Sequence, residues 1–136
     1  MINIDFSGKN VLITGAGGGI AAGIDRSYAK AGAKVHLADM DVKTLEKPAA
    51  ELKAMGCEVV THTMDVTDEA MVQKVIDDIV AADGKLDMLC NAAGIISVKN
   101  YMDDNSEMFE KILAVNLVGM HKCIQAALRH MLPAGA

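Results

Sequence analysis

The chain alternates between short apolar runs and longer segments of helical periodicity, and this alternation restricts the folds open to it. The short runs are rich in β-branched or other apolar residues and predict strands over residues 10–14, 33–38, 57–64 and 86–91. The segments between the runs are too long for hairpins and long enough for crossover helices. We therefore expect one α/β domain over residues 1–136, with a parallel sheet covered by helices.

Composition excludes several classes of protein. A formal net charge of -5 argues against nucleic acid as a partner, since phosphate binding needs a basic surface. No apolar run approaches the roughly 18 residues of a membrane-spanning helix, and the first ten residues lack the apolar core of a signal peptide. The cysteines lie far apart without metal-ligand spacing, and the histidines form no cluster with them, so we expect a cytoplasmic protein without a metal site.

The helix predicted over residues 67–84 has clear boundaries. Thr67 is the expected N-cap, Asp68 and Glu69 suit the first turn, and Gly84 suits the left-handed residue that ends a helix. The preceding helical segment, residues 41–56, contains Pro48 in its interior. Either that helix kinks at Pro48, or its regular part begins later.

The last helical segment, residues 105–131, is apolar around most of its circumference, whereas a surface helix has a polar half. We expect it to be buried against the sheet and against something further. A second subunit is the natural candidate, and additional chain of the same protein would serve equally.

A glycine-rich stretch, VLITGAGGGIAAGI, follows the first predicted strand at residues 11–24. A glycine turn between a strand and a helix lets the backbone approach a pyrophosphate, which the first N–H groups of the helix then bind. Two patterns fit the stretch. G-x-G-x-x-G/A would use Gly17, Gly19 and Ala22, and T-G-x-x-x-G-I would use Thr14, Gly15, Gly19 and Ile20.

The end of the apolar run favours the wider pattern. Because the run stops at Ile13, the tight turn must begin at Gly15. The glycines at 17, 18 and 19 then lie beside the phosphates of a dinucleotide, and Ile20 begins the helix as a core anchor. The predicted phosphate loop therefore comprises Gly15, Gly17, Gly18, Gly19 and Ile20.

Asp39 lies at the end of the second predicted strand, near the roughly 20-residue offset at which a carboxylate meets the adenosine ribose of a dinucleotide. A carboxylate there accepts hydrogen bonds from both ribose hydroxyls and repels a 2′-phosphate. The following Met40 and Asp41 supply no cation for that phosphate, so NAD is favoured over NADP. The alternative is that Asp39 only caps a helix.

Taken together, four motifs resemble the short-chain dehydrogenase/reductase family. TGAGGGIA at 14–21 is similar to the family's T-G-x-x-x-G-I-G loop, with Ala21 in place of the last glycine. MDVTD at 64–68 resembles its Asp-Val at the third strand, and CNAAG at 90–94 its N-N-A-G after the fourth. AVNLVG at 114–119 resembles the fourth helix, whose Asn matches Asn116.

The resemblance implies a role for each motif. Asp65 would receive the adenine amino group, and the Val66 backbone would hold the adenine ring. The N-A-A-G residues would pack against the adenosine ribose and stabilise the central sheet, and Asn116 would order a water in a proton relay. The alternative for Asn116 is a helix asparagine that bonds a backbone carbonyl. The ribose-side residues are Asn91, Ala92, Ala93 and Gly94.

The resemblance also implies a Rossmann-type, doubly wound sheet, of which residues 1–136 supply the strand order 3-2-1-4. The family's catalytic Ser and Tyr-x-x-x-Lys do not match any residues of this chain. The tyrosines are Tyr28 and Tyr101, and the residues four positions on are Gly32 and Asn105. We therefore expect the N-terminal half of a longer enzyme, truncated before the fifth strand and inactive alone.

The leading hypothesis is an NAD-dependent oxidoreductase that transfers hydride between nicotinamide and an alcohol or carbonyl substrate. Such an enzyme is expected to form a homo-oligomer, a tetramer, through its fourth helix. The alternative is a non-catalytic dinucleotide-binding module or inactive fragment. A methyltransferase is a third candidate, disfavoured by the Thr14-Gly15 loop and the N-A-A-G segment.

Overall fold

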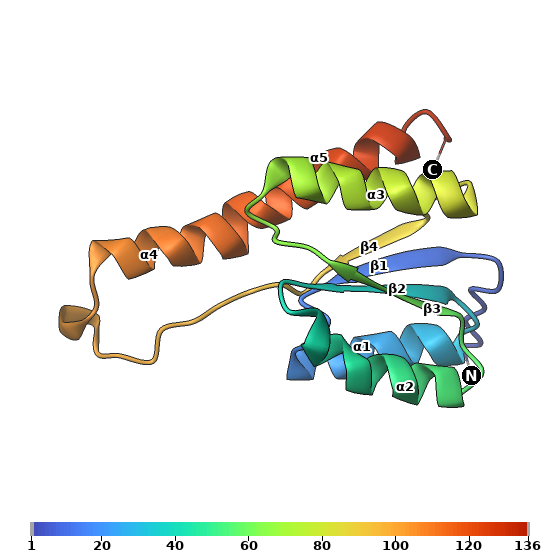
Figure 1. Ribbon diagram of the computed structural model, residues 1–136, viewed down its shortest axis with the longest axis horizontal. Helices are drawn as coiled ribbons and strands as arrows, with labels where there is room; N and C mark the ends of the chain where they lie inside the picture. The colour runs from blue at the N-terminus through green and yellow to red at the C-terminus, as the bar shows by residue number, and fades with distance from the viewer. Residues whose placement is uncertain (1, 136) are drawn as a thin grey trace.

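The computed structural model describes residues 2–135, and their centre is a parallel sheet of four strands in the order β3-β2-β1-β4 (Figure 1). This order and the parallel direction agree with the predicted Rossmann-type half. The strands are β1 (Asn10–Thr14), β2 (Lys34–Asp39), β3 (Val59–Thr63) and β4 (Met88–Asn91). The predicted runs were longer at several ends, because residues such as Ala33 and Leu86 are buried beside the strands without belonging to them.

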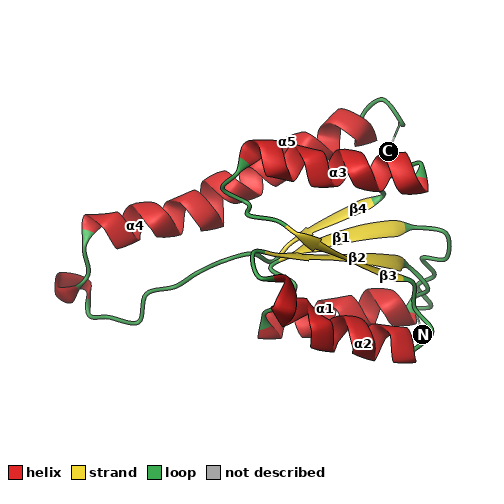
Figure 2. Cartoon of the chain, viewed as in Figure 1, coloured by secondary structure: helices red, strands yellow, loops and turns green. Residues whose placement is uncertain are grey.

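Helices cover both faces of the sheet, as Figure 2 shows. The α1 helix (Gly19–Lys30) and α2 (Glu46–Ala54) lie on one face, while α3 (Glu69–Asp83) and α5 (Met120–Met131) lie on the other. Each interface has its own hydrophobic core. Strand β1 is buried along its whole length, because both its neighbours and both helix layers cover it.

The start of α3 lies one residue later than predicted. Asp68 is the N-cap, and its carboxylate accepts a hydrogen bond from the Met71 amide at 3.0 Å. Thr67 instead donates both its amide and its hydroxyl hydrogen to Asp65, at 2.9 and 2.7 Å. The helix ends as predicted at Gly84, which has a φ of 82°.

The second alternative for Pro48 is confirmed. A 3₁₀ segment, η1 (Val42–Leu45), precedes α2, which begins at Glu46. Pro48 therefore lies in the first turn, where a missing N–H removes no intrahelical hydrogen bond.

The last segment differs from the prediction, because only its second part is buried against the sheet layer. It comprises α4 (Ser106–Leu113), a π-helical segment η3 (Ala114–Gly119) and α5. Figure 1 shows α4 and the preceding loop projecting beyond the strands, and α4 has no buried residue. Leu117 and Leu128 remain 57% and 39% exposed. Among the described residues, no helix has both the length and the apolar character needed to cross a membrane.

Asp25 is a charged residue inside the core between α1 and the sheet. It is 1% exposed, and neither carboxylate oxygen has a hydrogen-bond partner within the described chain. Burial raises the pKa of this carboxyl, because desolvation disfavours its charged form. The residue therefore opposes folding at neutral pH.

We predict that Asp25→Ala increases the free energy of unfolding at pH 7 by about 1–3 kcal/mol, because it removes an unpaired buried polar group. A raised pKa in the folded state means that the penalty grows as pH rises above the unfolded pKa of about 4. The gain should therefore shrink on acidification. Asp25→Asn, which keeps the shape without the charge, should give a smaller gain at pH 7 in urea denaturation, and this gain should fall toward zero on acidification. A loss of stability in Asp25→Ala at pH 7 would contradict this interpretation.

Candidate functional site: a cleft at the carboxyl ends of the strands

A cleft of about 410 Å³ lies where the loops that follow all four strands meet. In an open parallel sheet this edge is the usual place for a ligand. The cleft collects most of the residues predicted from the sequence. Those that line it are Gly15, Gly18, Gly19, Ile20, Asp39, Met40, Asp65, Val66, Ala92, Ala93 and Gly94.

The turn after β1 begins at Gly15, as the wider glycine pattern predicts. Gly15 has a φ of 61°, and a Cβ atom there would lie 2.5 Å from the Ala93 Cα. The turn closes with the Gly18 amide donating to the Gly15 carbonyl at 3.0 Å. A glycine is thus required twice over, by the backbone conformation and by the approach of the loop after β4.

Ile20 does not serve as the predicted core anchor, because its side chain is 82% exposed. The buried stripe of α1 passes through Ala21 and Asp25, which lie one helical turn apart. Ile20 is rotated by about 100° from that stripe and borders the cleft instead.

The first turn of α1 is open to a ligand. Its N-cap is Gly18, which offers no side-chain hydrogen bond, and the turn contains no acidic residue. A Cβ atom on Gly19 would meet nothing within 4 Å, so space remains next to these N–H groups. An uncapped helix N-terminus beside open space attracts an anion.

Asp39 connects the end of β2 to the glycine turn. Its Oδ2 accepts a hydrogen bond from the Gly17 amide at 3.0 Å. The side chain of Thr44 lies over the same glycine, and a Cβ atom on Gly17 would approach the Thr44 Cβ to 2.6 Å. Gly17 therefore lies against Thr44 and is not among the residues that line the cleft, and its place beside the phosphates stays a prediction.

The segment after β3 forms the other wall. Asp65 lines the cleft while its Oδ1 accepts the two hydrogen bonds from Thr67 described above. Val66 is buried against η3, where a Cβ atom on Gly119 would lie 2.6 Å from the Val66 Cγ2. Lys122 of α5 donates to the Thr67 carbonyl at 2.7 Å and fixes this segment to the helix.

Thr14 fixes the loop after β4. Its buried hydroxyl oxygen accepts hydrogen bonds from the amides of Ala92 and Ala93, both at 3.2 Å. The neighbouring Asn91 does not reach the cleft, and its Oδ1 is buried without a hydrogen-bond partner among the described residues. Ala92 and Ala93 thus form the site wall, whereas Asn91 lies behind it.

Asn116 bonds the backbone, as the alternative interpretation predicts, and its part in a proton relay stays a prediction. Its Oδ1 accepts from the Ile95 amide at 2.8 Å, and its Nδ2 donates to the Ile95 carbonyl at 2.9 Å. The residue lies in the π-helical segment η3, a conformation that is frequent at functional sites. Asn116 therefore holds the loop that borders the cleft without lining the cleft itself.

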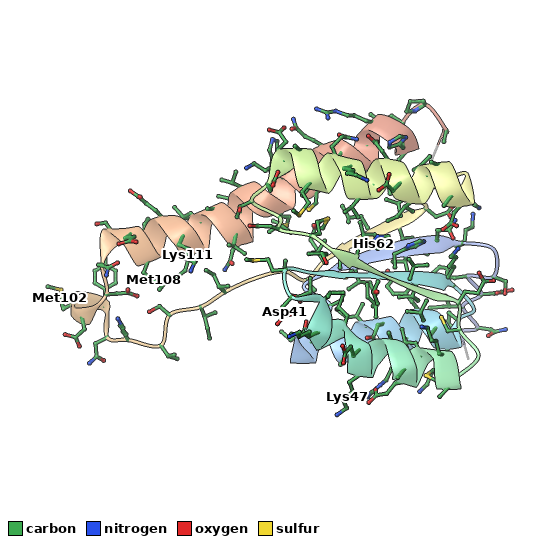
Figure 3. All side chains as sticks on the ribbon, in the orientation of Figure 1. Asp41, Lys47, His62, Met102, Met108 and Lys111 are labelled. Carbon is green, nitrogen blue, oxygen red and sulfur yellow. The ribbon has the colours of Figure 1, made fainter. Side chains whose placement is uncertain are left out.

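Sequence reasoning missed five further lining residues, which are Ala21, Met64, Ile95, Lys111 and Val115. Ala21, Met64 and Val115 belong to the quoted motifs, so their membership was a usable signal. Lys111 comes from α4, whose position relative to the sheet no local pattern reveals. Figure 3 shows Lys111 on the projecting helix, where it adds a cation to the cleft rim.

Comparison with known proteins identifies the family. A profile of short chain dehydrogenases matches residues 9–136. A short chain dehydrogenase/reductase of Colletotrichum higginsianum is 34% identical over 95% of this chain and 50% of its own length. D-threitol dehydrogenase of Mycolicibacterium smegmatis is 33% identical over 98% of this chain and 53% of its own length.

Solved structures agree. A short-chain type dehydrogenase/reductase from Mycobacterium marinum superposes with a TM-score of 0.90 at 36% identity, over 96% of this chain and 53% of that one. NAD⁺-bound xylitol dehydrogenase superposes with a TM-score of 0.90 at 34% identity, over 95% of this chain and 50% of that one. The chain belongs to the short-chain dehydrogenase family of nicotinamide-dependent oxidoreductases. It spans about half the length of the curated relatives it matches.

We predict that Thr14→Val lowers the free energy of unfolding by about 1–3 kcal/mol, because it leaves two amides in the loop after β4 without their acceptor. The change is nearly isosteric, so packing should be retained. Thr61→Val on the exposed part of β3 is the matched control and should change stability by less than about 0.5 kcal/mol. Equal effects of the two substitutions in urea denaturation would refute the bonding role of Thr14.

Proposed function

We propose that this chain is the cofactor-binding part of an NAD-dependent oxidoreductase acting on an alcohol or carbonyl compound. The observation that carries the proposal is the open N-terminus of α1 beside a glycine turn, with Asp39 hydrogen-bonded to that turn and lining the same cleft. The first feature suits a pyrophosphate and the second a ribose with free hydroxyls. The family supports a nicotinamide cofactor in general, and the acid supports NAD in particular.

The residues of the cleft fit a dinucleotide. Gly19 and Ile20 would bind the pyrophosphate through backbone N–H groups, with Gly18 beside it, and Asp39 would bind the adenosine ribose. Asp65 and Val66 would contact the adenine, and the loop at Ala92–Gly94 would pack against the sugar. When bound, the nicotinamide supplies or accepts the hydride; this chain's residues bind the cofactor and orient it.

Cofactor selectivity tests the assignment of Asp39. In the parent chain, NADH should bind more tightly than NADPH, because the Asp39 carboxylate repels a 2′-phosphate. Asp39→Ala should narrow this preference by about tenfold or more, which corresponds to about 1.4 kcal/mol. Isothermal titration with both cofactors measures the change, and Asp78→Ala on the exposed side of α3 is the distant-charge control. Equal affinities of the parent chain for the two cofactors would count against the proposal.

A second substitution tests the phosphate loop. Gly19→Ala should leave the fold intact, since the added methyl group meets no protein atom within 4 Å and alanine favours a helix. It should nevertheless weaken NADH binding by about tenfold or more, because the methyl group occupies the space next to the pyrophosphate. Gly23→Ala, on the same helix and equally free of neighbours, should leave NADH affinity unchanged. If Gly19→Ala retains full affinity, the pyrophosphate does not bind there.

We also propose that residues 1–136 bind the cofactor without turnover. The family's general acid is a tyrosine beside a lysine. Here Tyr28 of α1 packs against Phe6, and burial raises the pKa of the Tyr28 phenol. Tyr101 is 90% exposed in a 3₁₀ turn, η2 (Tyr101–Asp103), and neither tyrosine lines the cleft. A non-catalytic dinucleotide-binding module remains the alternative function on the same grounds.

The exposed apolar residues of α4, η3 and α5 support assembly as a homo-oligomer, which we propose to be a tetramer. Phe109, Leu117 and Leu128 are at least partly exposed on this continuous helix, and an apolar face of this kind marks an interaction site. We propose a cytoplasmic location because all three cysteines are free thiols, which suits a reducing compartment.

A further inference from the structure

Two histidines lie face to face on the sheet surface beneath α3. The Nδ1 of His36 in β2 is 2.9 Å from the Nε2 of His62 in β3, and the other nitrogen of His36 is 2.7 Å from Asp83 Oδ2 in α3. His36 is 2% exposed. Figure 3 shows His62 in the layer between the sheet and α3. Hydrogen bonds thus connect three elements through one buried ring.

Charged residues of β2, α3 and the segment before β3 surround the histidine pair. Lys34 of β2 donates to the second oxygen of Asp83 at 2.7 Å and lies 3.8 Å from Glu58, just before β3. Asp78 of α3 is the other carboxylate that faces His62, and it is also paired with Lys74. Although burial opposes the effect, the bonds from Lys34 and His36 lower the pKa of Asp83, which therefore stays ionised. The described residues contain no group of three or more His, Cys, Asp or Glu side chains suited to a metal ion.

The geometry limits how many protons the pair can hold. Ionised Asp83 accepts from the Nε2–H of His36, so neutral His36 accepts at Nδ1 from the Nε2–H of His62. One added proton leaves the bond intact, either on the Nδ1 of His62, or on the Nδ1 of His36 if His62 changes to the Nδ1–H tautomer. Two added protons place an N–H on both facing nitrogens and break the bond. Burial lowers the pKa of both rings, that of His62 to about 4 with the neighbouring His36 contributing.

The position of the pair relates it to the cleft. His36 and His62 each lie three residues before an acid that lines the cleft, Asp39 after β2 and Asp65 after β3. Between the pair and the cleft, the Met64 amide donates to the Asp39 carbonyl at 2.9 Å. Loss of the hydrogen bond between His36 and His62 would therefore loosen the neighbouring backbone that positions Asp39 and Asp65.

We propose that Asp83, His36 and His62 form a proton-sensitive tie that joins β2, β3 and α3 and controls the geometry of the cofactor cleft. The part of this proposal that concerns the cofactor rests on the proposed function. The direction of the pH effect on opening follows from proton linkage. Both histidines are neutral in the folded state and protonate near pH 6.5 when released, so opening becomes easier as pH falls below 6.5.

Amide exchange of Met64 tests the tie without any cofactor. From pH 7.5 to 5.5, the release of one histidine favours opening by about tenfold, given an ordinary pKa of 6.5. The protection factor of Met64, corrected for intrinsic exchange, should fall by about tenfold more in the parent chain than in His62→Gln. Glutamine can still donate to His36 but does not titrate. His121→Gln, at an exposed position of α5, should behave like the parent chain. Equal pH dependence in the parent chain and His62→Gln overturns the proposal.

A second measurement on the parent chain holds even if His62→Gln fails to fold. Nitrogen-15 spectra of the imidazole rings at pH 7 should show the Nε2–H tautomer for both His36 and His62. His62 should stay neutral down to pH 5, and titration of His62 near pH 6.5 overturns the tie.

The affinity for NAD⁺ tests control of the cleft. Between pH 7.5 and about 4, the value to which the pKa of His62 is lowered, the Kd of the parent chain for NAD⁺ should rise by a larger factor than that of His62→Gln. If the Kd rises by the same factor in both chains, the tie does not control the cleft. The exchange data then decide separately whether the tie exists. Absence of NAD⁺ binding at every pH overturns the proposed function together with its control by the tie, whereas the exchange data still decide whether the tie exists.

Discussion

The cleft exists because the backbone at the end of β1 and the backbone after β4 pass within contact distance of each other. Gly15 permits this approach, since any side chain there would overlap Ala93. The Thr14 hydroxyl then binds the amides of Ala92 and Ala93 and holds the two segments together. From this junction the loop after β4 runs toward η3, where Asn116 forms hydrogen bonds with the backbone of Ile95. The wall that follows β4 therefore depends on a glycine and a threonine at the end of β1.

The parts of this arrangement that local chemistry determines were predictable. Alternation of apolar and helical segments gave the strands, and the resemblance to a family gave their order. Gly15 and Gly84 were identifiable because a left-handed residue at a strand end or a helix end leaves few alternatives to glycine. Asp39 was placed correctly at the end of β2 because the apolar run stops there.

The errors concern choices that depend on tertiary structure. Ile20 looked like a core residue because it is apolar, but the orientation of α1 against the sheet selects Ala21 instead. Thr67 and Asp68 are both suitable N-caps. Because Thr67 is hydrogen-bonded to Asp65, Asp68 caps the helix instead. The exposed position of α4 and the presence of Lys111 at the cleft depend on a π-helical segment that no spacing in the sequence indicates.

The π-helical segment η3 changes the rotational register of the side chains between α4 and α5. A π turn accommodates an extra residue, and one residue corresponds to about 100° of rotation around a helix. The side chains of α5 are oriented by α3 and the sheet beneath them, and the extra residue in η3 turns the side chains of α4 relative to that orientation. Because α4 also has no buried residue, its apolar face can change without disturbing the packing of α5 or the strands that hold the cleft.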